Sequence, residues 1–338
     1  MLRHGCQTVG FLLIATFAAC AIARAAADDN APVPGSIAES SQADQPPMVA
    51  GDAQSGYEYV TENPQPRDLT LANFLDAGWS DEWVKRERPT DTPDQALLRV
   101  GTNFMEREIR MNYYTQQNPT SSATRALTDF DGLIAWSFNR RLMVEITGLY
   151  QWNDPHTGVG TSGSAPGLVT RFQLIDTESS SYALQLKWTA PNEELGSFQT
   201  TFAYQVAGFE DLDYWFGIKR TAFYYSLAFD SYEGPGVAGG KRNDCAYDIT
   251  LAKTITDKKT PLLGNLTFFV ENYATTDMDG SHGGRTLVTI TPGVRFNLGR
   301  YEPANIGKDN CIMFGTDIPV STYQPWDALY RFTYIKNF

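Results

Sequence analysis

The chain has 338 residues, which allows one large or two medium domains, and its formal net charge is −12. An N-terminal export signal that carries Arg3 and Arg24 would take two positive charges with it and leave −14. An acidic chain of this kind lacks the basic face on which nucleic acid binds, which excludes nucleic acid as a partner.

Residues 1–25 have the pattern of a secretory signal peptide. Arg3 supplies the positive start, residues 9–23 form an apolar core, and Ala23-Arg24-Ala25 is a small-residue cleavage site. The apolar core is too short to serve as a membrane-spanning anchor. The pattern therefore predicts export, with cleavage near Ala25. A lipoprotein is the alternative, because Phe17-Ala18-Ala19-Cys20 loosely resembles a lipobox.

Two segments of different composition follow the signal. Residues 26–66 are rich in Ala, Ser, Pro, Gln and Asp, which predicts a disordered periplasmic segment or, alternatively, a tail that binds the cell wall or a partner. Residues 67–97 mix apolar and charged side chains, which predicts one or two short amphipathic helices. Such a piece would pack against a rim, cap a mouth or enter a barrel as a plug. Its apolar residues are Leu69, Leu71, Phe74, Leu75, Trp79, Trp83 and Val84.

From residue 98 to the end, runs of about ten residues alternate apolar and polar side chains between polar or Gly-rich turns. A strand has period two, so one face can meet lipid while the other meets water. In the last run, Tyr330, Phe332 and Tyr334 share one face and Arg331 lies on the other. Residues 98–338 are therefore predicted to form an all-β fold, an antiparallel transmembrane β-barrel of about 12 strands. The predicted strands are 99–114, 125–138, 141–152, 167–175, 181–190, 197–207, 221–231, 244–255, 264–275, 285–298, 311–320 and 326–338.

Alternation of the strands fixes the side of each connection if the chain ends on the periplasmic side. The longer loops 153–166, 232–243 and 276–284 then fall outside, and the tight link Asn139-Arg140 falls inside, as is typical of outer-membrane barrels. Segment 208–220 is assigned to a turn, because a thirteenth strand would break this agreement. A soluble β-sandwich would alternate in the same way, but the secretory signal, the strand number and the aromatic last strand favour the membrane barrel.

The polar faces of the predicted strands would enclose a charged lumen. Six acids and six bases would either pair as a salt-bridged filling or form a polar constriction that filters solutes. Both alternatives stay open, because a barrel of this size encloses only a modest bore. The candidate lumen residues are Glu106, Glu108, Arg110, Arg141, Glu145, Arg171, Lys187, Asp248, Glu271, Arg295, Asp317 and Arg331.

The sequence offers little for catalysis or metal binding. After export the chain keeps only His156 and His282, both in predicted external loops, so no catalytic residue is predicted and an outer-membrane hydrolase is the least favoured function. Asp277-Met278-Asp279-Gly280 resembles the start of a calcium loop. Its twelfth position is Val288, however, where such a loop needs a glutamate. Neither a cofactor nor a metal site is predicted.

The exported chain also keeps Cys245 and Cys311. Alternation places Cys245 at the outer end of one strand and Cys311 at the periplasmic end of another. A disulfide requires Cα atoms within about 7 Å, whereas the hydrophobic band of such barrels is about 25 Å tall. The topology therefore predicts two free thiols.

Residues 330–338, YRFTYIKNF, resemble the C-terminal strand of bacterial outer-membrane barrels. In those proteins a terminal Phe, with aromatic residues at alternate upstream positions, is read by the barrel-assembly machinery. The resemblance implies this role for Tyr330, Phe332, Tyr334 and Phe338, although Lys336 departs from the usual pattern. It also implies outer-membrane lipid and the assembly machinery as partners.

Residues 290–297 and 313–320 look like the late strands of the phenol-degradation MetA-type outer-membrane proteins. Those proteins are regarded as carriers of small hydrophobic molecules, so this resemblance implies transport without naming a solute. The leading expectation is a passive outer-membrane channel or transporter for a small molecule. The alternative is a structural or surface-interaction barrel whose lumen is closed.

Overall fold

The computed structural model describes most of the chain from residue 66 onward. The predicted signal peptide, residues 26–65, His156 and His282 lie outside the described residues. The described ranges are 66–86, 88–90, 92–93, 97–99, 103–117, 126–148, 151–153, 161–163, 166–191, 200–234, 241–257, 260, 263–280, 283–298 and 310–338.

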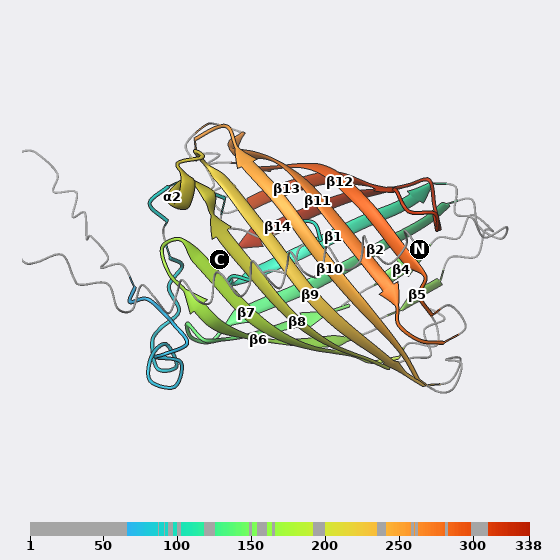
Figure 1. Cartoon of the computed structure of the whole chain (residues 1–338), viewed down its shortest axis with the longest axis horizontal. Coiled ribbons are helices and arrows are strands. Elements are labelled where there is room, and N and C mark those ends of the chain that lie inside the picture. Colours follow the sequence, from blue (N-terminus) through green and yellow to red (C-terminus); the bar gives the residue numbers. More distant parts are fainter. Residues whose placement is uncertain are drawn as a thin grey trace, which may run out of the picture. The chain divides into compact units, whose positions relative to one another are not determined.

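Twelve antiparallel strands close into a barrel (Figure 1), which confirms the predicted all-β fold. Each barrel strand pairs with the next along the chain, and β1 pairs with β14 in a register that joins Glu108 to Asn337. The barrel strands are β1 (Glu108–Gln117), β2 (Ala126–Ser137), β3 (Leu142–Thr147), β6 (Gly167–Asp176), β7 (Ser180–Thr189), β8 (Thr200–Asp211), β9 (Thr221–Glu233), β10 (Lys241–Thr254), β11 (Gly264–Asp277), β12 (Thr286–Asn297), β13 (Asn310–Pro319) and β14 (Ala328–Asn337).

The barrel has two distinct ends. β1 begins and β14 finishes at one of them, which we call the Phe338 end, and the short helix α2 (Leu212–Phe216) between β8 and β9 lies there too (Figure 1). A separate two-stranded sheet of β4 (Gln151–Asn153) and β5 (Thr161–Gly163) lies toward the opposite end. No helix of the described residues is long and apolar enough to cross a membrane.

The period of two along each strand sorts side chains between the outside and the lumen. In β1, for example, Met111 and Tyr113 are exposed on the outer face, whereas Arg110 and Asn112 are buried. A continuous apolar outer surface of this kind fits lipid, and the polar inner face fits water or internal ion pairs. Exposed apolar residues on other strands are Ile134, Ile146, Leu186, Phe202, Val206, Leu251, Val270, Ile290 and Phe314.

The predicted strand number is confirmed, but the strand boundaries differ, most of all in three places. β1 begins at Glu108 instead of residue 99, because the described residues 97–99 and 103–107 are not part of the wall, and Leu97 and Phe104 pack against its inner face. The predicted strand 141–152 ends at Thr147, and its last residues contribute to β4 instead. The predicted turn 208–220 contains the last residues of β8 and then α2, which is capped by Asp211 and ends at Gly217 with φ of 68°.

The helices predicted for residues 67–97 are wrong for the described part of that segment, which forms turns. The carbonyls of Thr70 and Ala77, which a helix would use for its own hydrogen bonds, accept from the Arg141 guanidinium instead. The Asn73 carbonyl accepts from this guanidinium as well as from the backbone N–H of Ala77. Leu69 forms an antiparallel bridge with Asp176 of β6, so this backbone extends the sheet beyond the short β3. Competition from the barrel rim therefore overrides the helical pattern.

Candidate functional site

Several described residues that precede β1 contact the inner face of the wall at the Phe338 end. Oγ1 of Thr92 donates to Oδ1 of Asp211 over 2.9 Å. The hydroxyl of Tyr224, on the lumen face of β9, donates to the carbonyl of Pro93. We call this piece the plug and define it as the described residues 92–93, 97–99 and 103–107.

An apolar layer joins the plug to the barrel wall near the Phe338 end. Leu97 is fully buried, and the ring centroid of Phe104 lies 5.1 Å from that of Phe209. The wall residues come from β8 to β11, where they follow one another in the register around the lumen. Close packing of this layer holds the plug residues Leu97 and Phe104 against this side of the wall. The layer consists of Leu97, Phe104, Phe209, Ala222, Tyr224, Ala252 and Phe269.

A charged cluster lies directly beyond the apolar layer, farther from the Phe338 end. Arg99 of the plug donates from Nε to Oδ2 of Asp317 over 2.9 Å, and its backbone N–H donates to Oε1 of Glu271 over 3.2 Å. Arg331 donates to the same Oδ2 of Asp317 over 2.8 Å. The Arg99 guanidinium also lies 4.4 Å above the ring of Tyr273. The plug is thus fastened by charge to Glu271 of β11 and Asp317 of β13.

A second charged cluster lines β1, β3 and β6. Arg110 donates from Nη2 to Oε1 of Glu108 over 2.7 Å. Arg171 lies 3.6 Å from the Glu145 carboxylate and donates to the plug carbonyl of Phe104 over 2.9 Å. Ion pairs therefore join part of the lumen charges, namely Arg110 with Glu108, Arg171 with Glu145, and Arg331 with Asp317.

Glu106 is a buried acid of the plug, two residues before β1. Burial raises the pKa of its carboxyl to about 8, and the nearby Glu108 adds to the increase. One of its oxygens has no hydrogen-bond partner among the described residues. The buried Glu106 carboxyl is therefore only partly satisfied by hydrogen bonds within the described residues.

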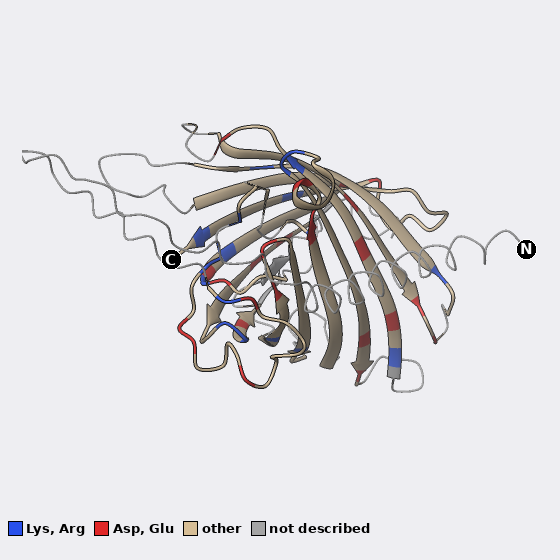
Figure 2. Cartoon of the chain, turned by 60° about the vertical axis from the view of Figure 1, so that its left-hand side comes forward, with Lys and Arg blue, Asp and Glu red and all other residues tan. Residues whose placement is uncertain are grey.

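A cavity of about 290 Å³ occupies the lumen beyond the plug. Leu98 and Arg99 form part of its lining, and Asp230 of β9 and Lys187 of β7 contribute from strand positions farther from the Phe338 end. Figure 2 shows that acidic and basic positions occur both on the barrel strands and on the segment that precedes β1. The cavity is large enough for a small solute and is polar on several sides.

The register places most of the predicted lumen residues on the inner face, but not Arg141. Arg141 is fully buried in the link between β2 and β3, where it holds the turns of residues 70–77 instead of facing a pore. Arg295 lies on β12, nearer to the Phe338 end than the charged cluster, and donates to Sγ of Cys311 over 2.9 Å. The others surround the plug or the cavity, namely Glu106, Glu108, Arg110, Glu145, Arg171, Lys187, Asp248, Glu271, Asp317 and Arg331.

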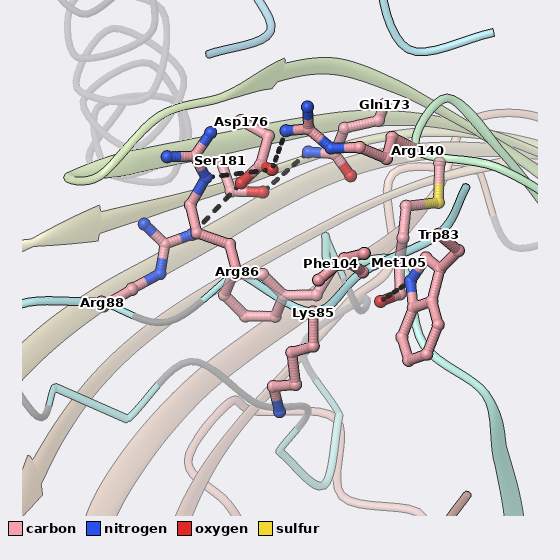
Figure 3. A pocket seen from close by; sticks show the side chains of 11 residues that line it. Trp83, Lys85, Arg86, Arg88, Phe104, Met105, Arg140, Gln173, Asp176 and Ser181 are labelled. Atoms are coloured by element: carbon pink, nitrogen blue, oxygen red, sulfur yellow. Dashed lines mark hydrogen bonds and ion pairs between the residues drawn. The ribbon is translucent and has the colours of Figure 1, made fainter. Parts of the chain in front are cut away.

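A pocket at the rim, shown in Figure 3, was not predicted from the sequence. The Asp176 carboxylate accepts from Arg86 and Arg140 over 3.3 Å each and lies 3.7 Å from Arg88. Arg86 also pairs with Asp68 at 3.0 Å. The three arginines tie the segment before the plug to the β2–β3 and β6–β7 connections.

Arg99 and Tyr273 are the other residues that sequence reasoning missed. Arg99 stands at the start of an apparently continuous alternating run, which placed it in the first strand. Tyr273 stands two residues after Glu271 in β11, so the alternation of the strand places it on the lumen face. It was missed because only charged side chains were considered as lumen candidates. The two-residue alternation of the strand therefore predicts the lumen position of Tyr273. Nothing in the sequence around residue 99 predicts the position of Arg99.

Both cysteines of the described residues are free, as predicted. Cys311 is buried on the lumen face of β13, where Leu98 packs against its cluster with Met313 and Ile335. Cys245 is half-buried near the opposite end of β10. The native chain thus carries one thiol that the plug covers.

The C-terminal aromatic residues lie on the outer face. Phe338 donates its backbone N–H to the carbonyl of Arg107 over 3.1 Å, and its ring centroid lies 5.8 Å from that of Trp136. Tyr330, Phe332 and Tyr334 precede it along β14 on the same face.

No protein-family model and no curated protein matches this chain. Among solved structures, it is similar to the NanC porin at 8% identity, a TM-score of 0.42 and coverage of 69% of this chain and 99% of the porin. It is similar to the KdgM porin at 9% identity, a TM-score of 0.41 and coverage of 68% and 99%. An outer-membrane channel from Pseudomonas putida F1 has 14% identity, a TM-score of 0.44 and coverage of 72% and 97%.

Proposed function

We propose that this chain is an outer-membrane channel for small polar solutes and that the plug closes it at rest. The observation that carries the proposal is the polar cavity of about 290 Å³ inside a barrel with an apolar outer surface. Membrane barrels with polar interiors are suited to passive diffusion of solutes. The MetA-type resemblance supports a small solute, whereas the charged lining favours a polar one.

In this proposal the Phe338 end faces the periplasm. Export by a signal cleaved near Ala25, followed by insertion through the barrel-assembly machinery, would give that orientation. The short connections at residues 138–141 and 177–179 then lie on the periplasmic side, as in other outer-membrane barrels. The plug enters from the same side, so its displacement would connect the cavity to the periplasm.

A closed structural barrel is the second candidate, and the apolar layer favours it. Leu97 and Phe104 pack in the lumen as they would in the core of a soluble domain. If the plug never leaves, the cavity is only a vestibule. The two candidates therefore differ in a single property, the ability of the plug to move.

Conductance across planar lipid bilayers distinguishes them. The Leu97→Asp variant places a charge in the apolar layer, which opposes seating of the plug. We expect brief, infrequent openings for the native chain and sustained conductance for Leu97→Asp. Leu75→Asp is the matched control, because Leu75 is 84% exposed on the rim, and it should behave as the native chain does. Absence of conductance from all three proteins, each inserted and heat-modifiable, would favour the structural barrel.

A further inference from the structure

The seat of Arg99 has the features of a recognition site for a positively charged group. Asp317 receives the guanidinium, the Glu271 carboxylate lies beside it, and the Tyr273 ring lies under it at 4.4 Å. A carboxylate combined with an aromatic face is a common arrangement for binding guanidinium and ammonium groups. Thr291 donates to the second oxygen of Asp317 over 2.7 Å and so fixes the orientation of this carboxylate.

The seat contains three acidic side chains but only one plug arginine. Asp248, Glu271 and Asp317 are each at most 1% exposed, and among the described residues the arginines that interact with them are Arg99 and Arg331. Oδ2 of Asp248 and Oε2 of Glu271 are buried without a hydrogen-bond partner among the described residues. A buried, unpaired carboxylate is costly, so the cluster favours a cation.

The seat can also be reached from the cavity. Arg99, Asp248 and Tyr273 all line the cavity of about 290 Å³. The cavity and the apolar layer lie on opposite sides of the charged cluster. A solute that enters from the end opposite Phe338 therefore meets the edge of the cluster before it meets the apolar layer.

We infer that Asp317, Glu271, Asp248 and Tyr273 form a binding site for the guanidinium or ammonium group of a cationic solute, and that Arg99 occupies this site when the plug is seated. Departure of Arg99 alone would leave three carboxylates facing Arg331. A solute cation that takes its place supplies the missing charge, so binding of the solute and release of the plug are linked. The inference rests on the proposed function for the consequence of binding, which is opening.

Binding is measured by isothermal titration calorimetry on the refolded full chain in detergent micelles. The probe is methylguanidinium at non-denaturing concentrations, and methylurea is its neutral isostere. In the Arg99→Met variant the site is vacated while the length of the side chain is kept. We expect methylguanidinium to bind this variant at least roughly tenfold more tightly than the native chain, because Arg99 competes in the native chain.

Two further variants make the calorimetry specific. Arg99→Lys keeps a competing cation and should bind the probe as weakly as the native chain. Addition of Asp317→Asn to Arg99→Met should abolish the gain in affinity. Equal affinity of the native chain and Arg99→Met for methylguanidinium would overturn the inference, as would equally tight binding of methylurea.

The native thiol under the plug gives a second readout that needs no change at Arg99. In a Cys245→Ser background, Cys311 is the remaining thiol of the described residues, and it is 1% exposed. Methylguanidinium should accelerate its labelling by N-ethylmaleimide, whereas methylurea should not. An unchanged labelling rate at saturating methylguanidinium contradicts the link between solute and plug.

These measurements separate the inference from the proposed function. Tight, Asp317-dependent binding without conductance in bilayers would retain the site and reject the channel. Conductance of the Leu97→Asp variant without any binding of methylguanidinium would retain the channel and reject the site.

Discussion

Leu98 of the plug occupies the space that a side chain at Gly315 would need. A Cβ atom at Gly315 would lie 2.4 Å from Cδ1 of Leu98, far inside van der Waals contact. Gly315 lies on the lumen face of β13, two residues before Asp317, which holds Arg99. The glycine therefore allows the plug to approach β13 closely enough for the ion pair to form.

Gly315→Ala should displace the Leu98 side chain and so loosen the seating of the plug. Overpacking of this kind costs about 1–3 kcal/mol, so labelling of Cys311 in a Cys245→Ser background should accelerate by roughly tenfold or more. Gly132→Ala is the control, because a Cβ atom there would meet only the carbonyl oxygen of Arg110, at 3.8 Å. If both variants label Cys311 at the native rate, Leu98 does not depend on Gly315 for its position.

Arg141→Met should detach the segment before the plug from the rim. The guanidinium donates to the Ala77 carbonyl over 2.9 Å and to the Leu174 carbonyl over 2.8 Å, among other acceptors, and it is fully buried. Loss of these charge-assisted bonds should lower the free energy of unfolding by about 3 kcal/mol or more, measured by urea titration.

The matched control for this substitution is Arg220→Met. Arg220 pairs with Asp257, which is 69% exposed, and such surface pairs contribute only about 0–1 kcal/mol. A loss of stability in Arg141→Met no larger than in Arg220→Met would show that the rim contacts of Arg141 are dispensable.

The barrel could be predicted from the sequence because each wall strand repeats one local rule. In β14, Tyr330 and Phe332 meet the outside while Arg331 and Thr333 meet the lumen, and a period of two expresses this without any knowledge of the partner strand. The plug follows no such period. Arg99 acquires its role through distant residues such as Asp317, which lies 218 residues away, so no short stretch of the sequence contains both partners.

The same limit explains the error at Arg141. Arg141 precedes Glu145 by four residues, so the alternation of the predicted strand places both side chains on the lumen face. The turns of residues 70–77 then fill the rim and accept its hydrogen bonds, so it never reaches the pore. A strand pattern predicts the wall of a barrel, whereas a segment that lies against the wall must be found from tertiary contacts.

Val270→Arg tests the outer face. Val270 is 51% exposed near the middle of β11, so a charge there would lie near the centre of the bilayer and should cost about 2–4 kcal/mol in refolding experiments with lipid vesicles. Phe296→Arg should cost only about 0–1 kcal/mol, because Phe296 lies one residue before the end of β12. Equal costs would mean that the membrane does not centre on the middle of the strands.

Deletion of Phe338 should impair assembly into the outer membrane. The terminal residue donates its backbone N–H to Arg107 and packs its ring near Trp136, so it completes the seam between β14 and β1 as well as the aromatic signal. Phe338→Tyr keeps the ring and should assemble normally. The measurement is the amount of heat-modifiable protein in outer-membrane fractions, and equal amounts with and without Phe338 would remove its role in recognition.

Glu106 should make stability depend on pH in a direction opposite to that of an ordinary paired carboxylate. Burial first, and Glu108 second, raise its pKa from 4.5 to about 8 in the folded chain. Between these two values the unfolded chain has lost the proton and the folded chain still holds it. Stability from this group is therefore complete below pH 4.5 and is lost as the pH rises through about 8, by up to about 1.4 kcal/mol per pH unit.

Glu106→Gln should remove this part of the pH dependence, because an amide cannot ionise. Urea unfolding at a series of pH values from about 5 to about 9 measures it, since the slope of stability against pH reports the difference in bound protons. Glu82→Gln, an exposed position in the same N-terminal region, should leave the native slope unchanged. A native chain whose stability does not fall over this range, or a Glu106→Gln variant with the native slope, would mean that Glu106 is ionised in its buried position, with Lys85 and Arg110 stabilising the charge.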